Sequence, residues 1–189
     1  ARGDLLDSKT TTAGDPNTHA VSFIYDANRR LLTSTDALGF ATTNTYDEAG
    51  NLEAVEDRAG NVASFSYSAW GRKLTATAPS GTVTHFGYDA AGRSSTVTDA
   101  MGQVTRFGYD HAGRLTTTTD PLNQVVTRTY DASGRNDSLT NARGKTWLFG
   151  FTATGQPETL TTPLSRLTDT DYNLRGQPST ITEPSLQAT

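Results

Sequence analysis

The sequence predicts an all-β chain that folds as an antiparallel meander of β-hairpin repeats, each about 21 residues long. Three observations predict it: an aromatic residue recurs every 21 residues, two turn signals recur in every repeat, and threonine is the most abundant residue. A fixed period of this kind marks a repeat architecture. Threonine favours strands over helices. Turn signals every 10 or 11 residues leave no room for a helix longer than about two turns.

Two columns of residues define the repeat. The aromatic column contains Tyr25, Tyr46, Tyr67, Tyr88, Tyr109, Tyr130, Phe151 and Tyr172. Four residues after each aromatic comes a glycine column, made of Gly50, Gly71, Gly92, Gly113, Gly134, Gly155 and Gly176. The first repeat departs from the pattern, because Arg29 stands where the others have glycine.

The first turn of each repeat has the form Tyr-Asp-x-x-Gly. Its aspartates are Asp26, Asp47, Asp89, Asp110 and Asp131, and Ser68 replaces aspartate in the third repeat. An aspartate at this place can accept hydrogen bonds from backbone N–H groups two or three residues further on. The glycine can take the positive φ that closes a hairpin through a type I turn and a bulge. The motif therefore predicts a tight hairpin turn.

A second turn signal lies about ten residues after the first. It reads "DALG" from residue 36, "DRAG" from 57, "DAMG" from 99, "DPLN" from 120 and "NARG" from 141. The runs between turns are about six residues long, which is a strand length. Pro157 and Pro178 stand early in such runs and weaken pairing there. A β-solenoid with one coil per repeat is the rival fold, and antiparallel pairing would exclude it.

Alternation along the strands assigns side chains to faces. Phe107 and Tyr109 share a face, whereas Val104 points the other way. A short apolar column marks one face of the preceding strand and contains Val55, Val97, Leu139, Leu160 and Ile181. The 21-residue step predicts a ladder of stacked rings on alternate strands. Both faces are expected to be mixed in polarity, and a sheet of this many strands is expected to curl.

Composition limits the core and the domain organisation. Leu, Ile, Val and Phe form only about 17 % of the chain, which is too little for a thick core. The net charge is only −4 and the aromatics are regularly spaced, so disorder is not expected. Cysteine is absent, and no run is long and apolar enough to span a membrane. We expect one continuous repeat domain cut from a longer chain, with a partial repeat at 1–24, seven repeats at 25–171 and a truncated repeat at 172–189.

No residue pattern predicts an enzyme, a cofactor site or a metal site. The aspartate column suits turn capping better than acid–base catalysis, and His19, His85 and His111 are too scattered to form a ligand set. The glycine spacing matches no phosphate-binding loop. An arginine column suggests a basic stripe and contains Arg30, Arg72, Arg93, Arg114 and Arg135. The acidic pI near 5.3 argues against nucleic acid, and cation–π contacts with the aromatic column are the better interpretation.

The repeated "Y-D-x-x-G-R-L" motif resembles the YD repeat of the RHS family. This family includes bacterial polymorphic toxins, the C components of insecticidal toxin complexes and, as relatives, teneurins. The resemblance covers about residues 15–189. It implies that the hairpins form a strip that spirals into a hollow β-shell around a C-terminal toxin polypeptide. The Asp-Pro of "TDPLNQ" at 119–124 lies in the ordinary turn column, so we do not expect it to be the family's self-cleavage site.

Two functions follow as hypotheses. The first is a non-enzymatic shell segment of a secreted or cell-surface bacterial RHS protein, with the rest of the shell and a toxin polypeptide as partners and with self-association through edge strands. The second is a carbohydrate-binding or adhesion module that uses Trp70 and Trp147 as stacking platforms. For both tryptophans, packing within the sheet is the expected role.

Overall fold

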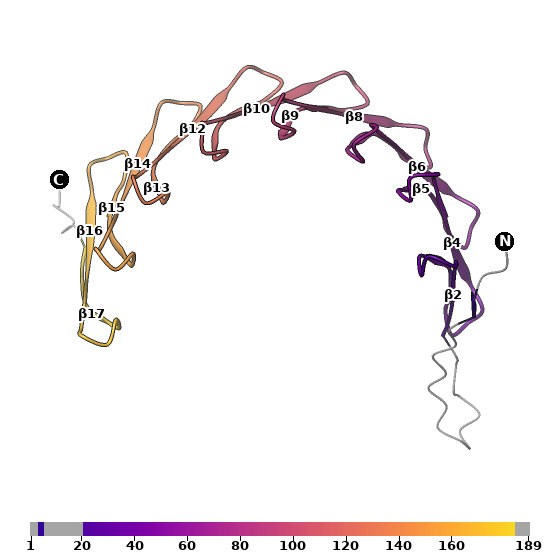
Figure 1. Ribbon diagram of the computed structural model, residues 1–189. Helices are drawn as coiled ribbons and strands as arrows, with labels where there is room; N and C mark the ends of the chain where they lie inside the picture. Colours follow the sequence, from indigo (N-terminus) through magenta and orange to yellow (C-terminus); the bar gives the residue numbers. More distant parts are fainter. Residues whose placement is uncertain (1–3, 6–20, 184–189) are drawn as a thin grey trace. The chain divides into compact units, whose positions relative to one another are not determined.

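The computed structural model describes residues 4–5 and 21–183, and these residues form β-strands and tight turns without any helix. Every strand pairing within the two compact units described below is antiparallel. Figure 1 labels most of the strands along the chain. The predicted all-β meander is therefore confirmed, and the β-solenoid is excluded. Most of the partial repeat at 1–24, including His19, lies outside the described residues, as do residues 184–189.

The chain divides into two compact units, of which the first contains residues 1–87 and 97–102. Each of its strands pairs with the next one in the sequence, from β1 to β8. The strands are β1 (Asp4–Leu5), β2 (Ser22–Tyr25), β3 (Leu31–Thr35), β4 (Ala41–Tyr46), β5 (Leu52–Glu56), β6 (Val62–Tyr67), β7 (Lys73–Thr77) and β8 (Val83–Tyr88).

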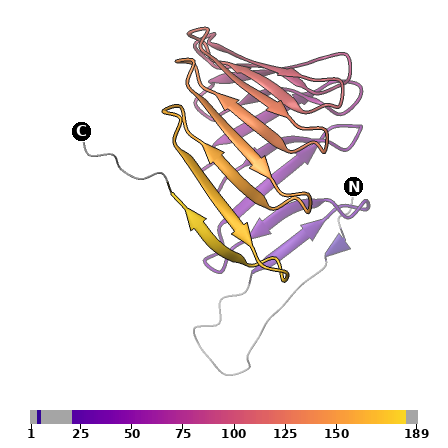
Figure 2. The same ribbon diagram turned by 90° about the vertical axis from the view of Figure 1, so that its left-hand side faces the viewer.

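The second unit contains residues 88–96 and 103–189, so the end of β8 and strand β9 (Ser94–Thr98) are divided between the units. Figure 2 shows its strands side by side, with turns alternately at the two ends. They are β10 (Val104–Tyr109), β11 (Leu115–Thr119), β12 (Val125–Tyr130), β13 (Asn136–Thr140), β14 (Thr146–Phe151), β15 (Pro157–Thr161), β16 (Leu167–Tyr172) and β17 (Pro178–Thr182). Both prolines begin their strands, where a missing N–H disturbs least.

The turns share one backbone pattern. In the turn after β10, the N–H of Gly113 donates to the carbonyl of Asp110 at 3.0 Å, and the N–H of Asp110 donates to the carbonyl of Arg114 at 3.0 Å. This is a type I turn closed by a glycine bulge, and Gly113 has a φ of 82°. Arg29, Asn123 and Ser165 take the same left-handed position with φ of 63°, 60° and 58°. We name the Tyr-Asp-x-x-Gly turns the first turns and the others the second turns.

A further bulge follows seven of the first turns. Tyr109 pairs with Leu115 while Gly108 pairs with Thr117, so Thr116 is left without a partner in the ladder. The same shift recurs after Tyr25, Tyr46, Tyr67, Tyr130, Phe151 and Tyr172. A bulge increases local twist.

The two faces of each unit differ in chemistry. Registers such as Phe107 with Thr118 and Thr118 with Val126 place the aromatic column and the short apolar column on the same face, which we name the aromatic face. All Phe, Tyr and Trp residues of the described strands lie there by alternation. The other face, the hydroxyl face, carries most of the strand threonines and serines, and also Val104 and its equivalents. Cross-strand hydroxyl pairs link it, as between Thr129 and Ser138 at 2.6 Å.

The units contain no fully buried side chain among the described residues. A single sheet has no second layer to cover its faces. The chain also has too few aliphatic residues to build a thick core. Stability must come from strand ladders and from contacts between neighbouring side chains on each face. No helix that could cross a membrane occurs in the described part of the chain.

Candidate functional surface: an arginine staple between repeats

The aspartate of the first turn caps that turn. Oδ1 of Asp110 accepts the backbone N–H of Arg114 at 2.9 Å. In the first repeat, Oδ1 of Asp26 accepts the N–H groups of Asn28 and Arg30, two and four residues further on. The predicted bond from the N–H two residues after the aspartate is confirmed. The predicted bond from the N–H three residues after it is wrong, because that N–H donates to the backbone carbonyl of the aspartate.

The other carboxylate oxygen binds an arginine. Nε of Arg114 donates to Oδ2 of Asp110 at 2.6 Å, which fixes the plane of the guanidinium. The pair is only partly exposed, with 34 % of the Arg114 side chain and 21 % of the Asp110 side chain accessible. The same pair is formed by Arg30 with Asp26, Arg93 with Asp89 and Arg135 with Asp131.

Held in this way, the arginine reaches the next repeat. The guanidinium carbon of Arg114 lies 4.7 Å from the ring centroid of Tyr130, and Nη1 donates to the carbonyl of Asp131 at 3.4 Å. We name this arrangement, from aspartate to arginine to the ring of the next repeat, the staple. It recurs at Arg30 over Tyr46, Arg93 over Tyr109 and Arg135 over Phe151, at 4.6 to 4.7 Å.

The staple replaces the predicted stacking of ring on ring. Equivalent rings are two strands apart, which is about 9.6 Å at normal strand spacing and too far for direct contact. A planar guanidinium fits between them. The aromatic hydroxyl adds a bond in the opposite direction, because the Tyr130 hydroxyl donates to the carbonyl of Leu115 at 2.7 Å. The rings of Tyr46, Tyr109 and Tyr130 are therefore each tied to the preceding repeat by two different contacts.

The turn glycine makes room for the staple. A Cβ built on Gly50 would lie 3.1 Å from Nη1 of Arg30, and one on Gly155 would lie 3.5 Å from Nη1 of Arg135. Glycine is thus favoured at this position both by its positive φ and by the arginine of the preceding repeat.

Three repeats have a shorter amide side chain in place of the arginine: Asn51, Gln156 and Gln177. Asn51 donates through Nδ2 to Oδ2 of Asp47 at 2.9 Å. Gln156 donates through Nε2 to the carbonyl of Gly176 at 2.8 Å. Turn capping also tolerates substitution, since the N–H of Arg72 donates to the Ser68 hydroxyl and that of Gln177 to Oδ1 of Asn173.

The hydrogen bonds lower the pKa of the turn aspartates. For Asp110 the backbone N–H of Arg114 is the main cause of the lowered pKa, and the guanidinium of Arg114 adds to it. For Asp89 the side chain of Arg93 is the main cause of the lowered pKa. The pKa of Tyr67 is raised by burial and then by the charge of Asp47. The turn aspartates, whose pKa is lowered, therefore remain ionised at neutral pH.

The staple leaves the aspartate column little capacity for catalysis. Both carboxylate oxygens of Asp26, Asp89, Asp110 and Asp131 already accept bonds from the turn and the arginine. His85 lies on the hydroxyl face of β8, and His111 lies in the turn after β10. No group of three His, Asp or Glu residues suited to a metal ion occurs among residues 4–5 and 21–183.

The two candidate tryptophan platforms have different environments. Trp70 lies in the turn after β6 with 81 % of its surface exposed, and the guanidinium carbon of Arg72 is 5.7 Å from its ring centroid. Trp147 is half-buried on the aromatic face of β14, opposite Leu139. Only Trp70 therefore presents a free ring to solvent.

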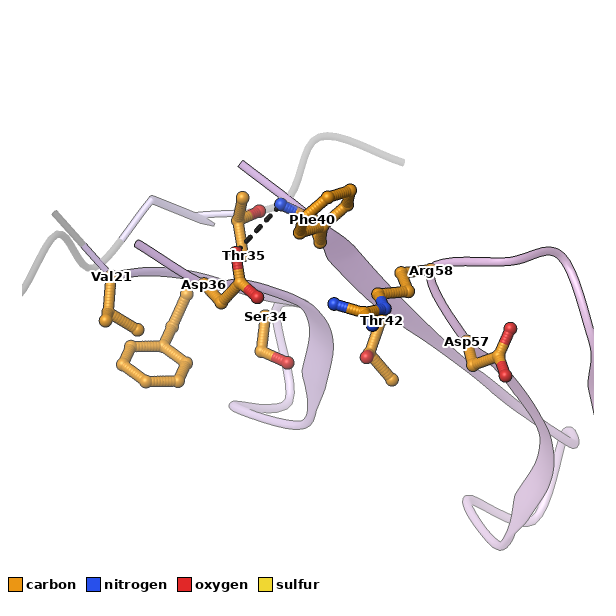
Figure 3. A pocket seen from close by; sticks show the side chains of 9 residues that line it. Val21, Ser34, Thr35, Asp36, Phe40, Thr42, Asp57 and Arg58 are labelled. Carbon is orange, nitrogen blue, oxygen red and sulfur yellow. Dashed lines mark hydrogen bonds between the residues drawn. The ribbon is translucent and has the colours of Figure 1, made fainter. Parts of the chain in front are cut away.

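Open hollows lie between successive second turns. Figure 3 shows one of about 410 Å³ in the first unit, lined by residues that include Phe23, Ser34 and Phe40. The N–H of Phe40 donates to Oδ1 of Asp36 at 3.0 Å, and the guanidinium carbon of Arg58 lies 4.8 Å from the Phe40 ring centroid.

The sequence predicted cation–π contacts between the arginine and aromatic columns. It did not predict that four of these arginines also bond the aspartate of their own turn and lie over the ring of the next repeat. The sequence signal of the staple is a constant spacing of 16 residues from Arg30 to Tyr46, from Arg93 to Tyr109 and from Arg114 to Tyr130. The spacing becomes informative only with the strand register, which shows that 16 residues lead to the neighbouring hairpin.

The sequence matches a protein-family model, and the fold matches solved structures. The RHS Repeat family matches residues 46–83, 73–100, 88–125 and 109–135, which together span 46–135. No curated protein sequence matches this chain.

Solved structures of toxin complexes share the fold. A chain of the TcdB2-TccC3 crystal structure matches with a TM-score of 0.65 and 17 % identity over 99 % of this chain and 14 % of that chain. The Photorhabdus luminescens Tc holotoxin pore gives the same values. TcdB2-TccC3 without its hypervariable C-terminal region matches with a TM-score of 0.57 and 18 % identity over 88 % of this chain and 11 % of that chain. The chain thus spans about one seventh of the length of the first two matched chains and 11 % of the length of the third.

Proposed function

This chain is an RHS-repeat protein, and from that premise we propose that it forms part of the wall of a hollow β-shell that encloses a C-terminal toxin polypeptide. The observation that carries the proposal is the staple. It links four pairs of neighbouring repeats by side chains as well as by strand pairing, as a wall without a core requires. The role is structural and not enzymatic.

The proposed mechanism is enclosure. Paired strands leave few free backbone N–H and C=O groups except at the first and last strand. The staples oppose the opening of neighbouring hairpins on the aromatic face. The hydroxyl face suits contact with an unfolded polypeptide, because it has no aromatic ring in the described strands and because several of its hydroxyls are paired with one another. Partners are then the rest of the shell and the enclosed polypeptide, in a secreted or cell-surface bacterial protein.

Limited proteolysis of the parent protein tests enclosure. We expect the polypeptide that follows the repeats to resist a protease in the native parent. It should be cleaved faster when Arg114→Ala and Arg135→Ala remove two successive staples. A matched parent with Arg106→Ala, a change at an exposed arginine of β10, should protect as the native protein does. Equal and rapid cleavage of the polypeptide in the native parent and in the Arg114→Ala, Arg135→Ala variant would contradict enclosure.

A carbohydrate-binding or adhesion module is the second candidate, and the exposure of Trp70 favours it. A ring that stacks on a sugar should lose roughly 1–3 kcal/mol of affinity when removed, as aromatic stacking does elsewhere. A glycan array probed with this chain distinguishes the two candidates. A selective signal that Trp70→Ala removes would support the binding module, and the shell proposal predicts no selective signal.

A further inference from the structure

The two turn edges of the repeats differ at the third residue of each turn. At the second turns, four of the seven residues are large and apolar, and they are strongly exposed: Leu38 (69 %), Met101 (82 %), Leu122 (76 %) and Leu164 (73 %). At the first turns the same position holds Asn28, Ala49, Ala91, Ala112, Ser133, Thr154 and Arg175, with Trp70 as the exception. We name the row of second turns the second-turn edge.

The hairpins themselves do not need these apolar residues. Ala59 and Ser80 occupy the same position in second turns that close with the same hydrogen bond, from Gly60 to Asp57 at 2.9 Å and from Gly81 to Ala78 at 2.8 Å. The type I turn accepts most residues at this place. Exposed apolar side chains gathered along one edge are typical of an interaction surface.

The same edge also carries two equivalent hollows, one in each unit. The hollow beside Ser34 has a counterpart of about 350 Å³ beside Thr118, four repeats later, lined by equivalent residues. Ser34 and Thr118 occupy the short apolar column, where Leu139 and Leu160 stand in later repeats. The smaller side chains leave these hollows open. The second turns of each unit thus carry two apolar tips and one such hollow.

A partner that engages several of these tips must present features at the same spacing. Successive second turns are two strands apart, about 10 Å, so Leu122 and Leu164, which are two repeats apart, lie about 20 Å from one another. The charged residues of the second turns further limit which partner can dock there. The second turns of the first unit carry Asp36, Asp57 and Asp99 with one arginine, Arg58, whereas those of the second unit carry Arg143, Lys145 and Arg166 with one aspartate, Asp120. The edge of one unit therefore complements the edge of the other in charge.

We propose that the second-turn edge is a docking surface for the second-turn edge of another repeat array of the same period, and that a second copy of this chain is such a partner. The acidic edge of one copy faces the basic edge of the other, with Leu122 and Leu164 seated between turns of the partner. The inference is independent of whether the array encloses a polypeptide.

Sedimentation velocity over a concentration series tests this docking. We expect the chain to associate reversibly, and the double variant Leu122→Ser, Leu164→Ser to weaken association at least about tenfold. Arg143→Glu and added salt should also weaken it. Trp70→Ser is the matched control, because it removes an equally exposed apolar residue at the same turn position of the opposite edge. It should leave association unchanged.

Pairing through the edge strand β17 is the competing route to self-association. Thr180→Lys places a charge on that strand and should not affect docking through turns. A chain that stays monomeric at every concentration would overturn the proposal. Association lost with Thr180→Lys but kept in the double leucine variant would also overturn it, in favour of strand pairing.

Discussion

The guanidinium of Arg93 lies over the ring of Tyr109, with 4.7 Å between its central carbon and the ring centroid, although the two residues belong to different hairpins. The same side chain bonds the carboxylate of Asp89 in its own turn and the carbonyl of Asp110 in the next. One arginine thus connects three groups in two repeats. The first turn is therefore both a reversal of the chain and the anchor of a contact between repeats.

Removal of one staple should destabilise the chain measurably. Arg114→Ala removes an ion pair, a cation–π contact and a long hydrogen bond, so we expect the free energy of unfolding to fall by about 1–2 kcal/mol. Arg114→Lys should recover only part of this, because an ammonium group lacks the planar fork. Arg106→Ala is the control and should change stability by less than about 0.5 kcal/mol. Urea denaturation followed by circular dichroism measures all three, and equal effects of Arg114→Ala and Arg106→Ala would refute the staple.

Arg29→Gly should stabilise the first unit. Arg29 has a φ of 63°, a conformation that is strained for residues with a Cβ. Relief of this strain should outweigh the extra freedom of glycine in the unfolded chain, for a net gain of roughly 0.5–1 kcal/mol. Asn123→Gly should gain less, because asparagine tolerates a φ of 60° better. Thermal unfolding of the two variants checks the order, and a larger gain at Asn123 would contradict it.

Gly113→Val should cost about 1–3 kcal/mol, because a β-branched residue is poorly tolerated at a φ of 82°. Gly87 and Gly108 occupy the same position of successive repeats, outside the turn. At Gly87 we expect alanine to be tolerated better than at a turn glycine, and Gly108 offers the same comparison. A Cβ on Gly108 would clash with Oγ1 of Thr117, so Gly108→Ala requires that hydroxyl to rotate away. Its cost should be smaller than that of Gly113→Val and should fall further with Thr117→Ala. Equal losses at the two glycines would show that the turn is wrongly placed.

Stability should decrease in acid. The pKa of Asp26, Asp47, Asp57, Asp89, Asp110 and Asp131 is lowered from the ordinary value of 3.8 in the folded chain. A carboxylate of this kind stabilises the fold above its unfolded pKa, and the contribution is lost as the pH falls through the folded pKa. The urea midpoint should therefore be steady near neutrality and fall below a pH of about 4.

Asp110→Asn is the control for the acid response. Asn141 and Asn173 make the same turn bonds without a charge, so the asparagine should keep the turn and make the pH dependence shallower. A midpoint that does not change in acid would contradict the role of the ionised carboxylates.

The parts of the fold that depend on local chemistry were predictable from the sequence. The Asp and Gly of each turn determine where the chain reverses, and alternation then assigns Tyr109 and Val104 to opposite faces. The bulge at Thr116 was not predictable, because it appears only when two strands are set in register. Cation–π contacts between the arginine and aromatic columns were predicted, but the pairing of Arg114 with Tyr130 of the next repeat was not, because it joins two hairpins and the turn motif describes only one.

The exposed residues of the second-turn edge illustrate another limit. Leu38 and Leu122 follow the repeat like structural residues, and their position in the sequence does not distinguish a packed leucine from an exposed one. Their exposure in the structure separates the two roles.

An electron cryomicroscopy map of the parent protein tests the central claim most directly, because it shows where the repeats lie and whether anything is inside them. We expect residues 21–183 to form part of a closed wall, with density for a polypeptide on its inner side. A map in which these repeats form an open array with both faces in solvent would contradict the shell.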